Sequence, residues 1–266
     1  MYPFDYVKPK ALEEAIAARR ADEDALYLAG GMTLIPTLKQ GLAMPSVLID
    51  LNGIAGLSDI AAEGEGVRIG AMTRHAEVAA SDLVRSRIPA LATLAGHIGD
   101  PAVRNRGTLG GSVANADPAA DYPAALLALG AMVRTDRREI PADEFFTGLF
   151  ETALADGEAI VSVFFPRPRR AAYAKFPNPA SRYAMVGVFV AEREDGVRVA
   201  VTGAGASVFR VPEMEKALEA DFRPEAIADC TIPSDGLNAD MHASAEYRAH
   251  LVGVMARRAV AAALAG

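Results

Sequence analysis

The chain has 266 residues, of which 51% are hydrophobic, 23% charged and 6% aromatic, and this composition excludes disordered and fibrous proteins. Its net charge of -7 argues against nucleic-acid binding, because phosphate recognition needs a basic surface. Cys230 is the only cysteine, so this chain alone holds neither a disulfide nor a cysteine-ligated iron–sulfur cluster.

The first 55 residues predict a small α/β unit. A helix is expected after a proline-bounded entry within residues 5–20, and a short buried strand at residues 25–29. Gly30-Gly31 ends that strand, and a helical pattern resumes before Gly41. A second strand follows at residues 47–51. The order is therefore strand, glycine turn, helix and strand.

Residues 56–170 are expected to form a central α+β part. It begins with a strand at residues 67–70 and helices at 75–80 and 89–98. A glycine-rich loop over residues 104–112 then precedes a helix at 121–129.

From residue 132 to about residue 211 the pattern favours strands of one antiparallel sheet. The expected strands are 131–135, 159–165, 186–193 and 198–205, with Asp195-Gly196 as a hairpin turn between the last two.

The end of the chain is predicted to be helical, at residues 211–219, 224–228 and 244–265. Leu251, Val254, Met255 and Val260 form an apolar stripe on the last helix, which indicates packing against a core. Interruptions of the pattern near residues 55 and 170 divide the chain into three expected domains, 1–55, 56–170 and 171–266.

Two glycine motifs are candidate ligand sites. Gly30-Gly31, between a strand and a helix, lets backbone N–H groups approach a pyrophosphate, although a glycine pair also marks an ordinary tight turn. Gly107, Gly110 and Gly111 lie in a second stretch that is poor in bulky side chains and suits an extended polar ligand.

Asp117 and Asp121, which follow the second glycine stretch, are candidate acceptors for ligand hydroxyl groups. As an alternative, either aspartate caps the helix expected at 121–129. The four histidines are scattered without a His-x-x-x-His pair, so surface or capping roles are expected for them and no metal site.

The glycine motifs are part of a wider resemblance. Ala29-Gly30-Gly31-Met32-Thr33-Leu34, Ile69-Gly70-Ala71-Met72-Thr73 and Thr108-Leu109-Gly110-Gly111-Ser112 resemble the FAD-binding medium subunits of the xanthine dehydrogenase and carbon monoxide dehydrogenase family. The resemblance continues through residues 145–152, 157–160, 175–176, 180–186 and 242–248, and therefore covers almost the whole chain. It implies an α+β protein with the two-part FAD-binding fold of the vanillyl-alcohol oxidase type, followed by a C-terminal α+β domain.

The resemblance also implies a role for particular residues. Residues 27–35 and 108–112 would line the FAD pyrophosphate, and Asp121 would contact ribityl or nearby hydroxyls. Tyr183 would lie over one isoalloxazine face, or would instead be a half-buried strand tyrosine. The full set is Tyr27, Leu28, Ala29, Gly30, Gly31, Met32, Thr33, Leu34, Ile35, Ile98, Thr108, Leu109, Gly110, Gly111, Ser112, Asp117, Asp121, Ile160, Val161, Lys175 and Tyr183.

The resemblance implies a flavin subunit of a molybdenum hydroxylase, with FAD as its cofactor. Its partners would be a small subunit with two [2Fe–2S] clusters and a large molybdopterin subunit, and the electron acceptor would be a quinone, NAD or oxygen. Three rivals are a free-standing FAD reductase of the same superfamily, a nicotinamide-only dehydrogenase and a flavin-free scaffold. The last is disfavoured because Gly110 and Gly111 are retained.

No basic stretch leads into an apolar run near the first residue, and no apolar segment reaches the ~20 residues needed to span a bilayer. We therefore expect a cytoplasmic protein with no direct membrane insertion.

Overall fold

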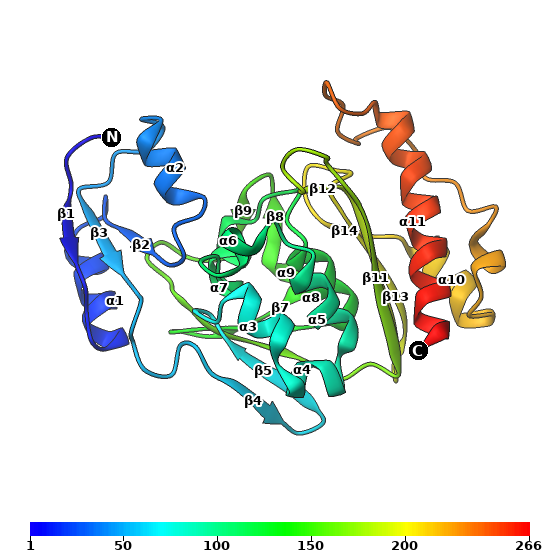
Figure 1. The fold of residues 1–266 in the computed structure, drawn as a ribbon, viewed down its shortest axis with the longest axis horizontal. Helices are drawn as coiled ribbons and strands as arrows, with labels where there is room; N and C mark the ends of the chain where they lie inside the picture. Colours follow the sequence, from blue (N-terminus) through cyan, green and yellow to red (C-terminus); the bar gives the residue numbers. More distant parts are fainter.

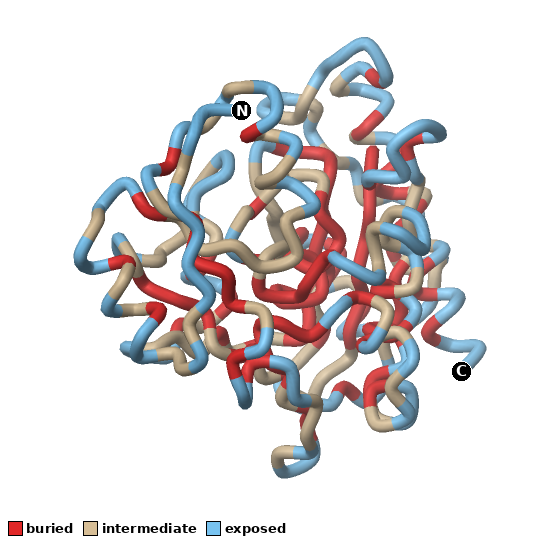
Figure 2. The backbone as a smooth tube through the Cα atoms, turned by 60° about the vertical axis from the view of Figure 1, so that its left-hand side comes forward, coloured by how far each residue is buried: buried red, intermediate tan, exposed pale blue.

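A computed structural model describes all residues from Met1 to Gly266. The three larger of four sheets follow one another along the molecule in sequence order, so the N-terminal and C-terminal parts lie at opposite ends (Figure 1). The chain is an α+β protein, as expected. Buried backbone is concentrated in the central part and in the sheet that follows it (Figure 2).

The N-terminal sheet is parallel, with strand order β1-β3-β2. The predicted strand, glycine turn and helix are present, but the entry segment forms a strand of its own that the sequence pattern did not indicate. Because the strands are parallel, the carboxyl ends of β2 and β3 lie at the same edge. The elements are β1 (Asp5–Val7), α1 (Leu12–Ala21), β2 (Leu26–Leu28), α2 (Leu34–Lys39) and β3 (Val47–Asp50).

The central sheet has the order β4-β5-β10-β6-β7 and is antiparallel. The expectation of one antiparallel sheet from residue 132 to residue 211 was wrong, because β10 pairs with β5 on one side and with β6 on the other, which places both strands in this sheet. Its strands are β4 (Ile60–Glu63), β5 (Gly66–Gly70), β6 (Met132–Thr135), β7 (Glu139–Pro141) and β10 (Ile160–Phe165), and a hairpin is made by β8 (Phe146–Gly148) and β9 (Glu151–Thr152).

Seven helices accompany the central sheet. Helix α8 is buried along its whole length because it also packs against the next sheet, at β12 and β13. The helices are α3 (His75–Ala80), α4 (Asp82–Arg87), α5 (Pro89–Gly96), α6 (Pro101–Arg104), α7 (Leu109–Asn115), α8 (Tyr122–Leu129) and α9 (Ala142–Phe145).

The C-terminal sheet has the order β11-β12-β13-β14. Helix α11 covers one face of it, and the predicted stripe lies in the core, with Val254 only partly buried. The expected hairpin is present, but its turn residues are Glu194 and Asp195, since Arg193 pairs with Gly196. The elements are β11 (Arg170–Pro177), β12 (Ala184–Arg193), β13 (Gly196–Thr202), β14 (Phe209–Arg210), α10 (Pro212–Ala220), η1 (Pro224–Ile227) and α11 (Ala245–Ala265).

Each sheet takes its strands from one of the ranges 1–55, 56–170 and 171–266, except that β11 begins one residue early at Arg170. We propose these ranges as the domains. No helix combines the length and the apolar character needed to cross a lipid bilayer.

Candidate functional site

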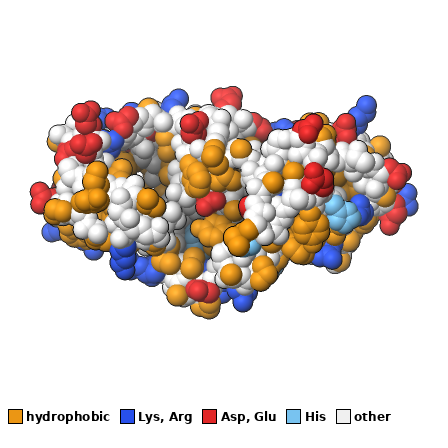
Figure 3. Space-filling view, turned by 90° about the horizontal axis from the view of Figure 1, so that it is seen from above, with side chains coloured by type: hydrophobic (Ala, Val, Ile, Leu, Met, Phe, Trp, Pro, Cys, Tyr) orange, Lys and Arg blue, Asp and Glu red, His pale blue; other side chains and the backbone are white.

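A cavity of about 550 Å³ lies between the N-terminal and central parts and reaches the turn between β11 and β12. Its volume falls in the ~300–1,000 Å³ range of small-molecule sites. Seen from above, hydrophobic side chains gather around a hollow near the middle of the molecule (Figure 3). The cavity brings together most of the predicted residues, namely Tyr27, Ala29, Gly30, Gly31, Met32, Thr33, Leu34, Ile98, Thr108, Gly110, Gly111, Ser112, Asp117, Asp121, Ile160 and Tyr183.

The first glycine loop presents free backbone donors to the cavity. The N–H groups of residues 30–33 donate to no group of the protein. Asn52, which follows the neighbouring strand, holds the loop by donating from Nδ2 to the Ala29 carbonyl at 3.0 Å. Unpaired N–H groups beside a cavity are the donors that a phosphate ligand needs.

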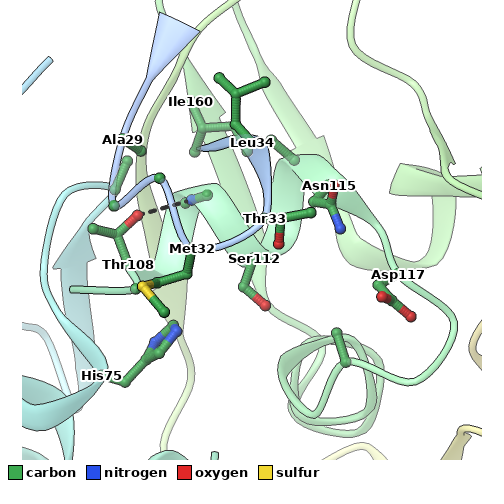
Figure 4. A pocket seen from close by; sticks show the side chains of 18 of the residues that line it. Ala29, Met32, Thr33, Leu34, His75, Thr108, Ser112, Asn115, Asp117 and Ile160 are labelled. Atoms are coloured by element: carbon green, nitrogen blue, oxygen red, sulfur yellow. Dashed lines mark hydrogen bonds between the residues drawn. The ribbon is translucent and has the colours of Figure 1, made fainter. Parts of the chain in front are cut away.

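The second glycine stretch is only in part the expected loop, because Gly107 lies between two helices while Gly110 and Gly111 belong to the helix α7. Helix α7 begins after Thr108, whose Oγ1 accepts a hydrogen bond from the Gly111 N–H at 3.2 Å (Figure 4). The N–H groups of Leu109, Gly110 and Ser112 also bond within the protein. This segment therefore offers side chains to a ligand in place of main-chain donors. Ser112 and Asn115 face Thr33 across the cavity (Figure 4).

The three glycine-containing segments interlock. The Gly110 N–H donates to the Ala71 carbonyl at 2.8 Å, and the Leu109 N–H donates to the Thr73 carbonyl at 3.0 Å. A Cβ atom at Gly110 would lie 2.5 Å from the Ala71 Cβ, and one at Gly30 would overlap the Arg106 carbonyl. These glycines are required by packing whether or not a cofactor binds. Their retention is therefore no argument against a flavin-free scaffold, contrary to the expectation from sequence.

One side of the cavity is largely apolar. The Tyr27 hydroxyl donates to the Gly157 carbonyl at 3.1 Å and joins the N-terminal part to the segment before β10. Leu26, Leu51 and Ile160 line this side. Glu158 lies in its wall, where hydrogen bonding by Arg138 lowers the pKa of the carboxyl from 4.5 to about 2.

The opposite side carries two aspartates. Asp121 is buried and accepts hydrogen bonds from the Tyr173 hydroxyl at 2.5 Å and from Lys175 Nζ at 3.0 Å. Asp117 accepts from the Ala119 N–H at 2.8 Å. Asp121 is the N-cap residue of α8, but its carboxylate accepts no hydrogen bond from the helix, and Asp117 lies outside the cap, so the capping alternative holds only for the position of Asp121. Burial raises the pKa of both carboxyl groups, and for Asp121 the Lys175 charge opposes that shift.

Tyr183 lies in the turn before β12 and remains 43% exposed at the mouth of the cavity. The alternative of a half-buried strand tyrosine was therefore wrong. Arg182, the preceding residue, has a left-handed backbone with φ 62°. The exposed aromatic ring of Tyr183 is available to a planar ligand group.

His75 contradicts the expected surface or capping role. It is buried, lines the cavity, and lies with its ring centroid 5.4 Å from that of Tyr122. Burial, assisted by the Arg104 charge, lowers the pKa of His75 from 6.5 to about 4. The other histidines are exposed, and no group of three or more histidine, cysteine or acidic side chains is placed to hold a metal ion.

This pKa predicts an acid-dependent loss of stability. As the pH falls from 6.5 to about 4, His75 becomes protonated in the unfolded chain but stays neutral in the folded chain, so the free energy of unfolding decreases. The full decrease is about 3 kcal/mol. We expect the His75→Gln variant to lack this decrease in the free energy of unfolding at pH values above those at which carboxylates titrate. Urea denaturation at several pH values measures it. An unchanged slope in the variant would contradict the assignment.

Five predicted residues lie outside the cavity lining: Leu28, Ile35, Leu109, Val161 and Lys175. Leu28 and Ile35 lie against Gly31 beneath the first loop, Leu109 is in the core, and Lys175 supports Asp121 from behind. Sequence reasoning missed other lining residues, including Leu26, Leu51, Met72, His75, Asn115, Glu158 and Arg182. Met72, Glu158 and Arg182 lie within segments that carry the family resemblance, and His75 follows the first of these segments by two residues, so these segments were the available signal.

The arrangement suits a ligand with two flat ends and a charged middle. Apolar walls lie at one side, free N–H donors near the centre, and aspartates with an exposed tyrosine at the other side. Dinucleotide cofactors have this sequence of groups. The fold and the cavity thus define a dinucleotide-binding protein, and the residues present fit FAD.

Comparisons with known proteins identify the family. The family described as the FAD binding domain in molybdopterin dehydrogenase matches residues 2–168. The nicotine 6-hydroxylase medium subunit of Paenarthrobacter nicotinovorans is 38% identical over 269 residues, which cover 96% of this chain and 95% of that protein. The carbon monoxide dehydrogenase medium chain of Hydrogenophaga pseudoflava is 36% identical over 279 residues, 98% of this chain and 97% of that one.

Solved structures agree. Carbon monoxide dehydrogenase from Hydrogenophaga pseudoflava, in a form lacking the Mo-pyranopterin moiety, matches with a TM-score of 0.90 at 35% identity, covering 100% of this chain and 99% of that chain. Quinoline 2-oxidoreductase from Pseudomonas putida 86 matches with a TM-score of 0.90 at 28% identity, covering 100% and 98%. The chain belongs to the FAD-binding family of molybdopterin dehydrogenases. It is a FAD-binding medium subunit of the molybdenum hydroxylase class and an oxidoreductase component, as the resemblance implied.

Proposed function

We propose that the chain holds FAD in the elongated cavity and uses it to pass electrons from a partner subunit to an external acceptor. The free N–H groups of residues 30–33 would bind the pyrophosphate, with the Ser112 hydroxyl beside them. The apolar side near Leu51 and Ile160 would take the adenine, and the isoalloxazine would lie between Ile98 and Tyr183. The observation that carries this proposal is the row of free donors between an apolar wall and an aspartate-lined wall.

FAD supplies a group that takes up electrons singly and delivers them singly or in pairs. The chain would position the FAD. Asp117 and Asp121 present carboxylate oxygens to ligand hydroxyl or N–H groups, and Lys175 fixes Asp121 from outside the cavity. Tyr183 lies at the mouth of the cavity, where its exposed ring would pack against the isoalloxazine.

The partners belong to the same proposal. With one cysteine the chain cannot by itself ligate an iron–sulfur cluster. The family resemblance implies that electrons would come from a small subunit with two [2Fe–2S] clusters, supplied in turn by a large molybdopterin subunit. Relatives named medium chains or medium subunits support this arrangement. The large subunit would decide the substrate. A quinone, NAD and oxygen remain the candidate acceptors, and a cytoplasmic location remains a prediction.

The test is the cofactor content of the purified full chain, alone and with co-expressed partners. We expect absorption bands near about 370 and 450 nm, with close to one FAD released per chain on heating. A folded, colourless chain that takes up no added FAD in the presence of partners would favour the flavin-free scaffold. Substrate turnover without partners would favour the free-standing reductase.

Asp117 gives a sharper variant test. Asp117→Asn keeps the shape but removes the charge that faces the cavity, so the dissociation constant of FAD should rise about tenfold or more, the worth of one charge-assisted hydrogen bond. Asp235→Asn changes the charge equally at an exposed position away from the cavity and is the control. Flavin fluorescence titration measures both. Equal dissociation constants for the two variants would show that the Asp117 carboxylate does not contact FAD.

A further inference from the structure

A second cavity, of about 290 Å³, opens beside the first and is strongly cationic. It lies between the end of α5, helix α6 and the β11–β12 turn, and it shares Gly99 and Arg182 with the first cavity. No carboxylate and no large apolar side chain line it. The lining residues are Gly96, His97, Gly99, Arg104, Lys175, Pro177 and Arg182.

Three of these side chains are cationic, and two are not neutralised. Lys175 is paired with Asp121 at 2.9 Å and also donates to the His97 carbonyl at 3.2 Å. Arg104 uses one terminal nitrogen on the Ile98 carbonyl at 2.9 Å, and its guanidinium has no carboxylate within 4.0 Å. Arg182 has neither a carboxylate partner nor a side-chain hydrogen bond. In a chain of net charge -7 this is a local excess of positive charge.

The backbone holds Arg182 at this place under strain. Its φ of 62° is left-handed, a conformation that costs an arginine roughly 1 kcal/mol. The Arg182 N–H donates to the Asn178 carbonyl at 2.9 Å, and the Asn178 side chain accepts from the N–H groups of Ala180 and Ser181. These hydrogen bonds of the turn hold the Arg182 backbone at the junction of the two cavities.

We infer that the second cavity binds an oxyanion of the size and charge of a phosphate group, between Arg104 and Arg182. Two guanidinium groups with free donors offer the planar fork that binds phosphate oxygens in pairs. Lys175 also lines this cavity, but its charge is paired with Asp121, so the two arginines carry the free positive charge. The phosphate is either free in solution or part of a dinucleotide electron acceptor. A quinone and oxygen carry no such group.

The test uses the full chain, loaded with FAD and also without FAD, with sodium phosphate as the probe. Phosphate is titrated at constant ionic strength against chloride, and binding is followed by ³¹P line broadening and calorimetry. We expect saturable binding in both samples, weakened at least about tenfold by Arg182→Gln and by Arg104→Gln. Arg258→Gln, an exposed arginine of α11 without an ion pair, is the control and should bind phosphate as the parent does.

A second titration with nicotinamide dinucleotide distinguishes the sources. Dinucleotide binding that is tighter than phosphate binding and sensitive to both arginine variants assigns the phosphate to an electron acceptor. If both arginine variants weaken phosphate binding but the dinucleotide binds no more tightly than phosphate, the site binds a free phosphate ion. Binding that FAD abolishes and the arginine variants leave unchanged would place phosphate in the first glycine loop and overturn the inference, as would no saturable binding. FAD content is recorded on the same samples, so failure of the flavin proposal is seen separately.

Discussion

Gly30→Ala is expected to lower the affinity for FAD about 5- to 150-fold, the equivalent of the ~1–3 kcal/mol that overpacking costs. A Cβ atom at residue 30 would overlap the Arg106 carbonyl and lie 2.8 Å from the Gly107 Cα. Both are backbone atoms, so the contact is relieved only if the first loop moves away from the central part. That movement displaces the free N–H groups of residues 30–33. FAD titration of the refolded or co-expressed chain measures the effect.

The control must separate loss of the site from loss of the fold. Gly253→Ala introduces the same methyl group in α11, where the nearest atom is 3.6 Å away at the end of a flexible arginine, and should leave FAD binding unchanged. Circular dichroism of both variants reports the fold. Normal FAD affinity in a folded Gly30→Ala chain would show that the first loop does not hold the pyrophosphate. Gly110→Val is a poorer test, because it would press on Ala71 within the central core.

Local pattern predicted the elements whose signal is contained in a few neighbouring residues. The change from a buried strand to a helical period at Gly30-Gly31 gave the first loop, and the apolar stripe of α11 gave its packing face. The aspartates were candidates because they follow the second glycine stretch, Tyr183 came from the family resemblance, and all three line the cavity as expected. What these residues bind remains a proposal.

The misses share one physical cause, which is that distant contacts decided the local structure. A pair of glycines costs a helix roughly 1 kcal/mol per residue, so the second glycine stretch was interpreted as a loop. The Thr108 cap and the carbonyls of Ala71 and Thr73 stabilise it as α7. The burial of His75 against Tyr122 is likewise invisible in its own segment. Strand partners are also long-range, so the pairing of β10 with β5 was not foreseen.

Lys175→Met is expected to lower the free energy of unfolding by about 3–5 kcal/mol, because it leaves the Asp121 carboxylate buried without its cation. The side chains of Lys175 and Asp121 are 4% and 5% exposed, so water compensates for little of the lost charge. The Tyr173 hydroxyl is the only other side-chain donor to Asp121. Urea denaturation measures the change.

Two further variants show whether the loss comes from the unpaired charge. In Asp121→Asn/Lys175→Met the charge is removed together with its partner, and most of the stability should return, since the amide oxygen still accepts from Tyr173. Lys8→Met removes the exposed cation of the Lys8–Asp50 pair and should cost less than about 1 kcal/mol. If the double variant is no more stable than Lys175→Met, packing of the lysine stem and not the buried charge accounts for the loss. If the double variant regains stability, it keeps the fold but has no charge at residue 121. Its affinity for FAD then shows whether FAD binding needs the Asp121 charge.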